Sequence, residues 1–292
     1  MPTEVVVTVL AEIGEFYWSP AYGRTREAFR TLASHSWKDA LVEFFQSYAF
    51  ERQGRSPHYS AAAIEAVRQY NGNVPRDDFE ACIWQTFLQQ LDVTPDGKGA
   101  AVKVNPLAPY FRKQRSKSIT SVVQELAESD YNLVRWASEA IGRGQLEETS
   151  EQIQSVRGLG AKISAWFLRD VVGAFDMDEQ GLEPAELLQP IDIWTRRGAS
   201  VLAGLHHILP YGRHGDARAA ETIVTASRAA GVRPTLVNTG LTMFGVLFAP
   251  TPEAFEEALA EPIALHRFLA KQRDVYAART RFLGEVLCAF LT

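Results

Sequence analysis

The chain has 292 residues, 46% hydrophobic and 22% charged, which is ordinary for a soluble globular protein with one large domain or two smaller ones. Its net charge of −5 excludes a uniformly basic surface, so contact with a nucleic acid would require a local excess of cations. Two cysteines, Cys82 and Cys288, are too few for a disulfide framework, a zinc site of four cysteines or a four-cysteine iron–sulfur cluster.

The first half of the chain predicts helices joined by polar connectors. The valine-rich residues 4–10 fit a strand or a helix, and we favour the helix. Ser36, with Asp39 three residues later, has the pattern of an N-cap and begins a helix expected to reach about residue 53. Further helices are expected at residues 60–70, 78–91, 120–127, 130–141 and 148–155, with residues 92–106 as a loop.

The cations of the first half gather in one stretch. Residues 98–117 contain six Lys or Arg and no acid. Within it, Tyr110–Lys117 could contact phosphates with an aromatic ring available for stacking, or could form the solvated face of a helix.

A tight turn is predicted between two helices at residues 156–162, which read Val-Arg-Gly-Leu-Gly-Ala-Lys. Gly158 and Gly160 permit a turn without side chains and leave bare N–H groups at the start of the next helix. Such a helix start attracts a phosphate. The pattern predicts a helix–hairpin–helix motif.

After the second helix comes an acidic connector, in which residues 176–186 carry five acids and no base. Gln189-Pro-Ile-Asp192-Ile-Trp-Thr-Arg-Arg197 then places an acid just before another predicted helix. Helices are expected at residues 193–207, 216–230 and 235–248, with two more to the end. Strand patterns are almost absent, so the predicted fold class is all-α.

The turn and the Pro-Ile-Asp segment together resemble the helix–hairpin–helix DNA glycosylase superfamily, and the Phe-Leu-Arg after the lysine is similar to its 8-oxoguanine branches. The resemblance covers about residues 36–248. It implies two helical lobes, 38–172 ending in the hairpin and 1–37 with 173–292, and a cleft between them for an extruded base. It also implies that the late helix 234–248 packs back on the N-terminal segment.

The resemblance assigns the chemistry to Lys162 and Asp192, which fall on the family's catalytic lysine and aspartate. The implied activity is excision of a damaged base, followed by AP lyase cleavage through a Schiff base on the lysine. The aspartate would stabilise positive charge on the sugar. The residues implied to contact DNA are Arg157, Gly158, Gly160, Ala161 and Arg197.

The implied partner is double-stranded DNA with a damaged base, bound by a monomer, and no cofactor is required. The backbone carbonyls of Gln154, Val156 and Leu159 match those that hold a monovalent cation in family members bound to DNA. The start of the chain has no secretory pattern and residues 236–250 are too short and polar to span a membrane. We therefore expect an intracellular protein, cytoplasmic and nucleoid-associated in a prokaryote.

Two departures from the family leave alternatives open. The spacing from Lys162 to Asp192 is longer than is usual, and Trp194 stands where many members have histidine. One alternative is a non-catalytic DNA-binding protein in which Lys162 touches phosphate and Asp192 only caps a helix. Another is a monofunctional glycosylase in which Asp192 activates water. Asp176 and Asp178 lie nearer the usual spacing but lack the flanking Pro-Ile and Arg.

Overall fold

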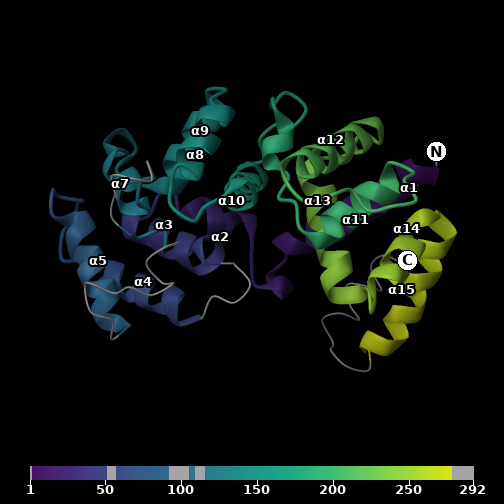
Figure 1. Cartoon of the computed structure of the whole chain (residues 1–292), viewed down its shortest axis with the longest axis horizontal. Coiled ribbons are helices and arrows are strands. Elements are labelled where there is room, and N and C mark those ends of the chain that lie inside the picture. The colour runs from purple at the N-terminus through teal and green to yellow at the C-terminus, as the bar shows by residue number, and fades with distance from the viewer. Residues whose placement is uncertain (1, 51–56, 92–104, 109–115, 278–292) are drawn as a thin grey trace. The chain divides into compact units, whose positions relative to one another are not determined.

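A computed structural model describes residues 2–50, 57–91, 105–108 and 116–277 (Figure 1). Within these ranges every regular element is a helix, and the one strand-like pairing is a β-bridge between Lys117 and Val156. The prediction of an all-α fold is therefore confirmed. In the same ranges, no helix has the length and apolar character needed to cross a membrane.

Contacts within the chain divide it into two compact units. Met1–Arg26 and Asp178–Thr292 form one, which we call the terminal unit. Glu27–Met177 form the other, which we call the hairpin unit. The hairpin unit therefore extends beyond the expected range 38–172 at both ends.

Hydrogen bonds explain why the hairpin unit takes in these additional residues. The Nδ2 group of Asn132 donates to the carbonyls of Leu32 and His35, at 2.8 and 3.1 Å. These bonds hold the segment before residue 38 to the helices of the hairpin unit. At the other end, Arg30 and Asp176 form an ion pair with 3.5 Å between Nη1 and Oδ2.

The hairpin unit is a bundle of helices around an aromatic core. Ser36 caps the helix that begins at Trp37, as predicted, since Ser36 Oγ accepts from the Asp39 N–H at 3.3 Å. Phe44 and Tyr48 lie edge-on to Phe167, with ring centroids 5.2 and 5.4 Å away. The helix that carries Phe167 is therefore anchored in the core. The helices of this part are α2 (Arg26–Thr31), α3 (Trp37–Phe44), the π-helical η3 (Phe45–Ala49), α4 (Pro57–Gln69), α5 (Phe79–Gln90), α7 (Ile119–Gln124), α8 (Leu133–Gly142), α9 (Leu146–Gln154) and α10 (Ala161–Ala174).

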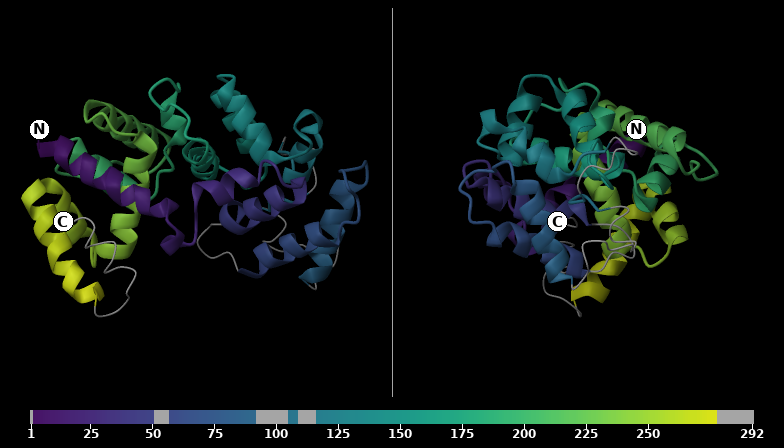
Figure 2. Two further views of the ribbon diagram at one scale, coloured as in Figure 1. Left: turned by 180° about the vertical axis from the view of Figure 1, so that it is seen from behind. Right: turned by 60° about the vertical axis from the view of Figure 1, so that its left-hand side comes forward.

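The terminal unit is organised around the packing of its first helix along a late one (Figure 2). Its helices are α1 (Pro2–Glu15), α11 (Ile193–Leu202), α12 (Arg213–Ala229), α13 (Pro234–Met243), the π-helical η6 (Phe244–Phe248), α14 (Pro252–Ala260) and α15 (Pro262–Ala277). Glycines permit the close approach of α1 and α13. A Cβ on Gly240 would lie 1.8 Å from the Leu10 carbonyl oxygen, and one on Gly14 would lie 2.1 Å from that of Leu236. The expected packing of the late helix on the N-terminal segment is confirmed.

Some helix ends differ from the prediction. The helix after Asp192 ends at Leu202 rather than at residue 207, and Gly204 follows with φ of 67°. A left-handed glycine there stops the helix. Most of the basic stretch 98–117 lies outside the described residues. Its last member, Lys117, pairs with Glu125 at 2.6 Å.

Candidate functional site

Residues 155–160 form the turn that joins α9 to α10. Gly158 adopts φ of 76°, in the left-handed region that glycine occupies without strain. The side chains of Val156 and Leu159 are buried, and Ser150 and Ser164 link the two helices through their hydroxyls at 3.1 Å. The predicted helix, turn and helix therefore form in this order, with a packed interior.

The start of α10 presents unpaired backbone donors. Gly160 is its N-cap and offers no side chain to accept from the first turn. The N–H groups of Ala161 and Lys162 find no acceptor among the residues that the structure describes. A Cβ on Gly160 would meet nothing within 4 Å, so the space beside the turn is open. This geometry suits an anion.

Lys162 is the second residue of α10, and its side chain is exposed. Its Nζ lies 5.8 Å from the ring centroid of Trp166, one helical turn later.

Arg157 is turned inward, with 6% of its surface exposed. Its Nε donates to Ser116 Oγ at 3.4 Å, and its backbone N–H donates to the Lys117 carbonyl at 2.9 Å. Burial lowers the pKa of the guanidinium below its ordinary value, although arginine stays charged at neutral pH. In this position the Arg157 side chain supports the turn from the interior of the hairpin unit and presents little surface that a phosphate could contact.

The carbonyls that the resemblance assigns to a monovalent cation lie at the end of α9 and in the turn. The Val156 carbonyl accepts from the Leu159 N–H at 3.1 Å, which still leaves it a second lone pair. The carbonyls of Gln154 and Leu159 accept no hydrogen bond from the described residues outside the helices. Oxygen donors of this kind fit a hard cation.

Asp192 is the N-cap of α11, and its two oxygens have different partners. Oδ1 accepts from the N–H groups of Trp194 and Thr195 at 2.8 and 2.9 Å, and the Asp192 N–H donates in turn to Thr195 Oγ1 at 2.7 Å. Oδ2 has only a 3.4 Å contact with the hydroxyl of Thr242 among the described residues. The capping role is therefore filled by one oxygen, and the other remains available on a half-buried side chain.

Arg197 and Trp194 both turn toward α14. Arg197 is 17% exposed and forms a close ion pair with Glu256, so its charge is already partnered. Trp194 packs against Phe255, with ring centroids 5.2 Å apart, and lies over Gly245, where a Cβ would come within 2.2 Å of the indole. Trp194 thus fills a packing role.

The acidic connector contains a buried acid that the sequence argument overlooked. Glu179 is 3% exposed and accepts from Arg233 Nε, the Thr235 N–H and the Thr235 hydroxyl at 2.6, 2.9 and 2.5 Å. It fixes the connector to the start of α13. Asp178 is exposed and accepts from the Gln180 N–H at 3.0 Å, so it serves the connector's own turn.

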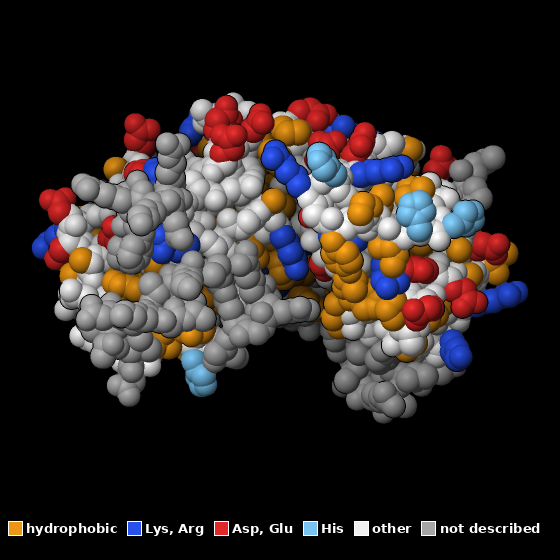
Figure 3. Space-filling model, viewed as in Figure 1, with side chains coloured by type: hydrophobic (Ala, Val, Ile, Leu, Met, Phe, Trp, Pro, Cys, Tyr) orange, Lys and Arg blue, Asp and Glu red, His pale blue; other side chains and the backbone are white. Residues whose placement is uncertain are grey.

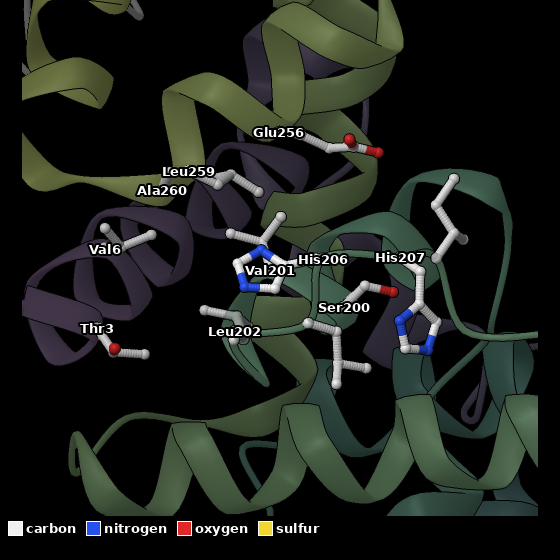
Figure 4. Close-up of a pocket in the computed structure, with 13 residues that line it drawn as sticks. Thr3, Val6, Ser200, Val201, Leu202, His206, His207, Glu256, Leu259 and Ala260 are labelled. Carbon is white, nitrogen blue, oxygen red and sulfur yellow. The ribbon is translucent and has the colours of Figure 1, made fainter.

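An open pocket of about 600 Å³ lies within the terminal unit, at the end of α11 beside α1 and α14 (Figure 4). Leu202, His206 and Glu256 are among the residues that line it (Figure 4). None of the predicted site residues lines this pocket. In the described ranges, no group of three or more His, Cys, Asp or Glu side chains could hold a metal ion.

Lys162 belongs to the hairpin unit and Asp192 to the terminal unit. Each has the local setting that the sequence predicts, at a helix start directly after a turn or connector.

Comparison with models of known protein families, with curated proteins and with solved structures found no match. Inference about function therefore depends on the site residues themselves.

Proposed function

We propose that this chain is a base-excision-repair DNA glycosylase with AP lyase activity, which removes an oxidised base such as 8-oxoguanine from double-stranded DNA. The observation that carries the proposal is the exposed amine of Lys162, the second residue of α10. It lies beside an open turn, where the first N–H groups of α10 have no acceptor among the described residues. The Oδ2 oxygen of Asp192, which accepts only a long 3.4 Å hydrogen bond from Thr242 among the described residues, supports it. The proposed active form is a monomer.

The proposed reaction begins with the uncharged amine of Lys162. It attacks C1′ of the sugar, the bond from C1′ to the base breaks, and the base leaves with a proton. The sugar ring opens to a Schiff base on the lysine. Loss of a C2′ proton then breaks the bond to the 3′ oxygen, and the strand is nicked.

Asp192 is proposed to act through Oδ2. A carboxylate near C1′ stabilises the positive charge that develops on the sugar as the base departs. Because Oδ1 holds the first turn of α11, the side chain is pre-oriented and need not reorganise during the reaction. The chemistry requires Lys162 and Asp192 to act on the same nucleotide.

The charge around the hairpin limits how DNA would dock. Exposed acids gather on the outer face of α9, at Glu147, Glu148 and Glu151 (Figure 3). They would repel a phosphate backbone laid along that helix. On the open side of the turn, no described atom lies within 4 Å of a Cβ added to Gly160, and Ala161 is exposed. We therefore propose that a phosphate meets the hairpin at the start of α10, with a monovalent cation on the turn carbonyls adding positive charge there.

Two other functions have specific support. The exposure of Lys162 is what a phosphate-contacting lysine needs, which favours a non-catalytic DNA-binding protein. The available Oδ2 of Asp192 would suit activation of water in a monofunctional glycosylase.

A panel of duplexes, each with one damaged base, separates these functions. The strand is scored for nicking before and after alkali, since alkali cleaves the abasic sites that a glycosylase leaves behind. We expect nicking before alkali for at least one oxidised purine. Nicking only after alkali would identify a monofunctional glycosylase, and binding without nicking in either case would identify a non-catalytic protein.

A further inference from the structure

Lys162, Trp166 and Arg169 lie about one helical turn apart along α10, and the two cations both approach the ring of Trp166. The Nζ of Lys162 and the guanidinium carbon of Arg169 both lie 5.8 Å from the ring centroid of Trp166. Lys162 is exposed, Trp166 is half-buried and Arg169 is 5% exposed. The ring thus connects the exposed amine with the interior of the hairpin unit.

The ring is held from the interior by a buried polar network. Tyr48 lies edge-on to Trp166, with centroids 6.2 Å apart and planes at 88°. The Tyr48 hydroxyl donates to Asp170 Oδ2 at 2.8 Å, and Arg169 donates to Oδ1 through Nε and Nη2 at 3.1 and 3.0 Å. Tyr48 and Asp170 are both fully buried. A network this well satisfied leaves little freedom to the groups it holds.

The indole N–H does not explain why this residue is a tryptophan. Trp166 Nε1 is buried and has no hydrogen-bond partner in the described structure. A buried tryptophan normally finds a partner, so a plain packing position would be served better by phenylalanine or leucine. Trp166 therefore interacts through the faces of its ring, and one of the two cations beside the ring is Lys162, the proposed nucleophile.

We propose that Trp166 is a positioning residue that holds the side chain of Lys162 in place for attack on the sugar; this rests on the proposed function. A free lysine side chain samples many rotamers, and ordering it carries a cost in conformational entropy. The ring attracts the ammonium form and keeps it over the start of α10. Once the amine loses its proton, this attraction disappears and the nucleophile is released beside its target.

The contact can be tested without any activity. The chain has seven lysines, and reductive ¹³C-methylation gives each a resolved NMR signal while keeping its charge. Loss of one signal in Lys162→Arg identifies Lys162. We expect that signal to be shifted upfield by the ring current, to lose the shift in Trp166→Leu and to keep most of it in Trp166→Phe. An unshifted Lys162 signal, or one unchanged in Trp166→Leu, would overturn the proposal.

The positioning role is tested by borohydride trapping on an abasic-site duplex. In Trp166→Leu we expect the trapping rate at saturating DNA to fall tenfold or more while the dissociation constant stays within threefold. Trp166→Phe keeps a ring face and should recover most of the rate, which also shows that the fold tolerates substitution there. A Trp166→Leu enzyme at full rate, or equal losses in both variants, would overturn this inference alone. A wild type that traps no DNA would overturn the proposed lyase itself, whatever the NMR result.

Discussion

The two oxygens of the Asp192 carboxylate have different partners, and the proposed function gives them different tasks. Oδ1 caps α11, and Oδ2 is left with a weak contact to Thr242. Asparagine caps a helix about as well as aspartate but carries no charge. In Asp192→Asn we therefore expect base excision to slow a hundredfold or more, about 2.7 kcal/mol of transition-state stabilisation, with little change in the urea midpoint.

Two matched variants separate the catalytic role from the cap. Thr195→Val removes the reciprocal hydrogen bond of the capping box, so it should lower stability by about 1 kcal/mol and leave excision intact. Asp178→Asn changes an exposed acid of the connector and should be silent in both assays. An Asp192→Asn enzyme at full rate, together with an inactive Asp178→Asn enzyme, would move the catalytic aspartate into the connector.

Glu179 makes a stability prediction at the same scale. Its carboxylate is buried and accepts hydrogen bonds from Arg233 and Thr235 at the start of α13. Glu179→Ala leaves these donors without their acceptor, so we expect a loss of about 3 kcal/mol in the free energy of unfolding. Glu183 of the same connector pairs with Arg228 while 63% exposed, and Glu183→Ala should cost less than about 1 kcal/mol. Equal urea midpoints for the two variants would show that Glu179 does not anchor the connector.

At the scale of elements, the turn between α9 and α10 is the proposed contact with the phosphate backbone. A side chain at Gly160 would enter open space, and φ of −102° suits any residue. Gly160→Glu places a negative charge beside the phosphate, so DNA affinity should fall roughly tenfold or more and depend less on salt. Gly160→Ala adds volume without charge and should bind like the wild type. Fluorescence anisotropy across a salt series measures both, and an unaffected Gly160→Glu protein would mean that DNA docks elsewhere.

The contact of α1 with α13 depends on the absence of a side chain at Gly240. An added Cβ would lie 1.8 Å from the Leu10 carbonyl oxygen, which is backbone and cannot turn aside. We expect Gly240→Ala to destabilise the chain by at least about 2 kcal/mol in urea unfolding. Gly142, at the end of α8, has nothing within 4 Å of an added Cβ, and Gly142→Ala should stabilise by up to about 1 kcal/mol. A stable Gly240→Ala protein would contradict the close packing.

Most elements could be predicted from the sequence because their signals are local. The cap at Ser36 and the glycines of the turn act within a few residues, and the structure has both where the pattern indicated. Helix ends were less predictable, since Gly204 ends α11 earlier than the apolar periodicity suggests. The short α2 was missed, because its printed side-chain partners, such as Asp176 for Arg30 at 3.5 Å, lie far away in the sequence.

For the candidate site, the sequence could predict which residues belong to it, but not which side chains they contact. It placed Lys162 and Asp192 at helix starts, as the structure has them. It could not show that Arg157 turns inward, that Glu256 already neutralises Arg197, or that Trp166 stands beside Lys162. These contacts depend on residues far apart in the chain or on side-chain direction, and neither leaves a periodic pattern.

At the scale of the whole molecule, the chain starts in the terminal unit, forms the hairpin unit and returns. The proposed nucleophile and the proposed carboxylate therefore come from different units. A net charge of −5 adds a further constraint, because long-range attraction to DNA is weak and local contacts must supply the affinity. We expect binding to be confined to low and moderate salt.

The nucleophile is the central claim, and covalent trapping tests it most directly. Borohydride added to the protein with an abasic-site duplex should reduce the Schiff base to a stable protein–DNA adduct. Lys162→Gln should abolish the adduct while DNA affinity stays within a few-fold, and Lys271→Gln, an exposed lysine of α15, should trap like the wild type. Peptide mapping should place the adduct on Lys162. Trapping that survives in Lys162→Gln, or a wild type that binds the duplex and is never trapped, would contradict this account.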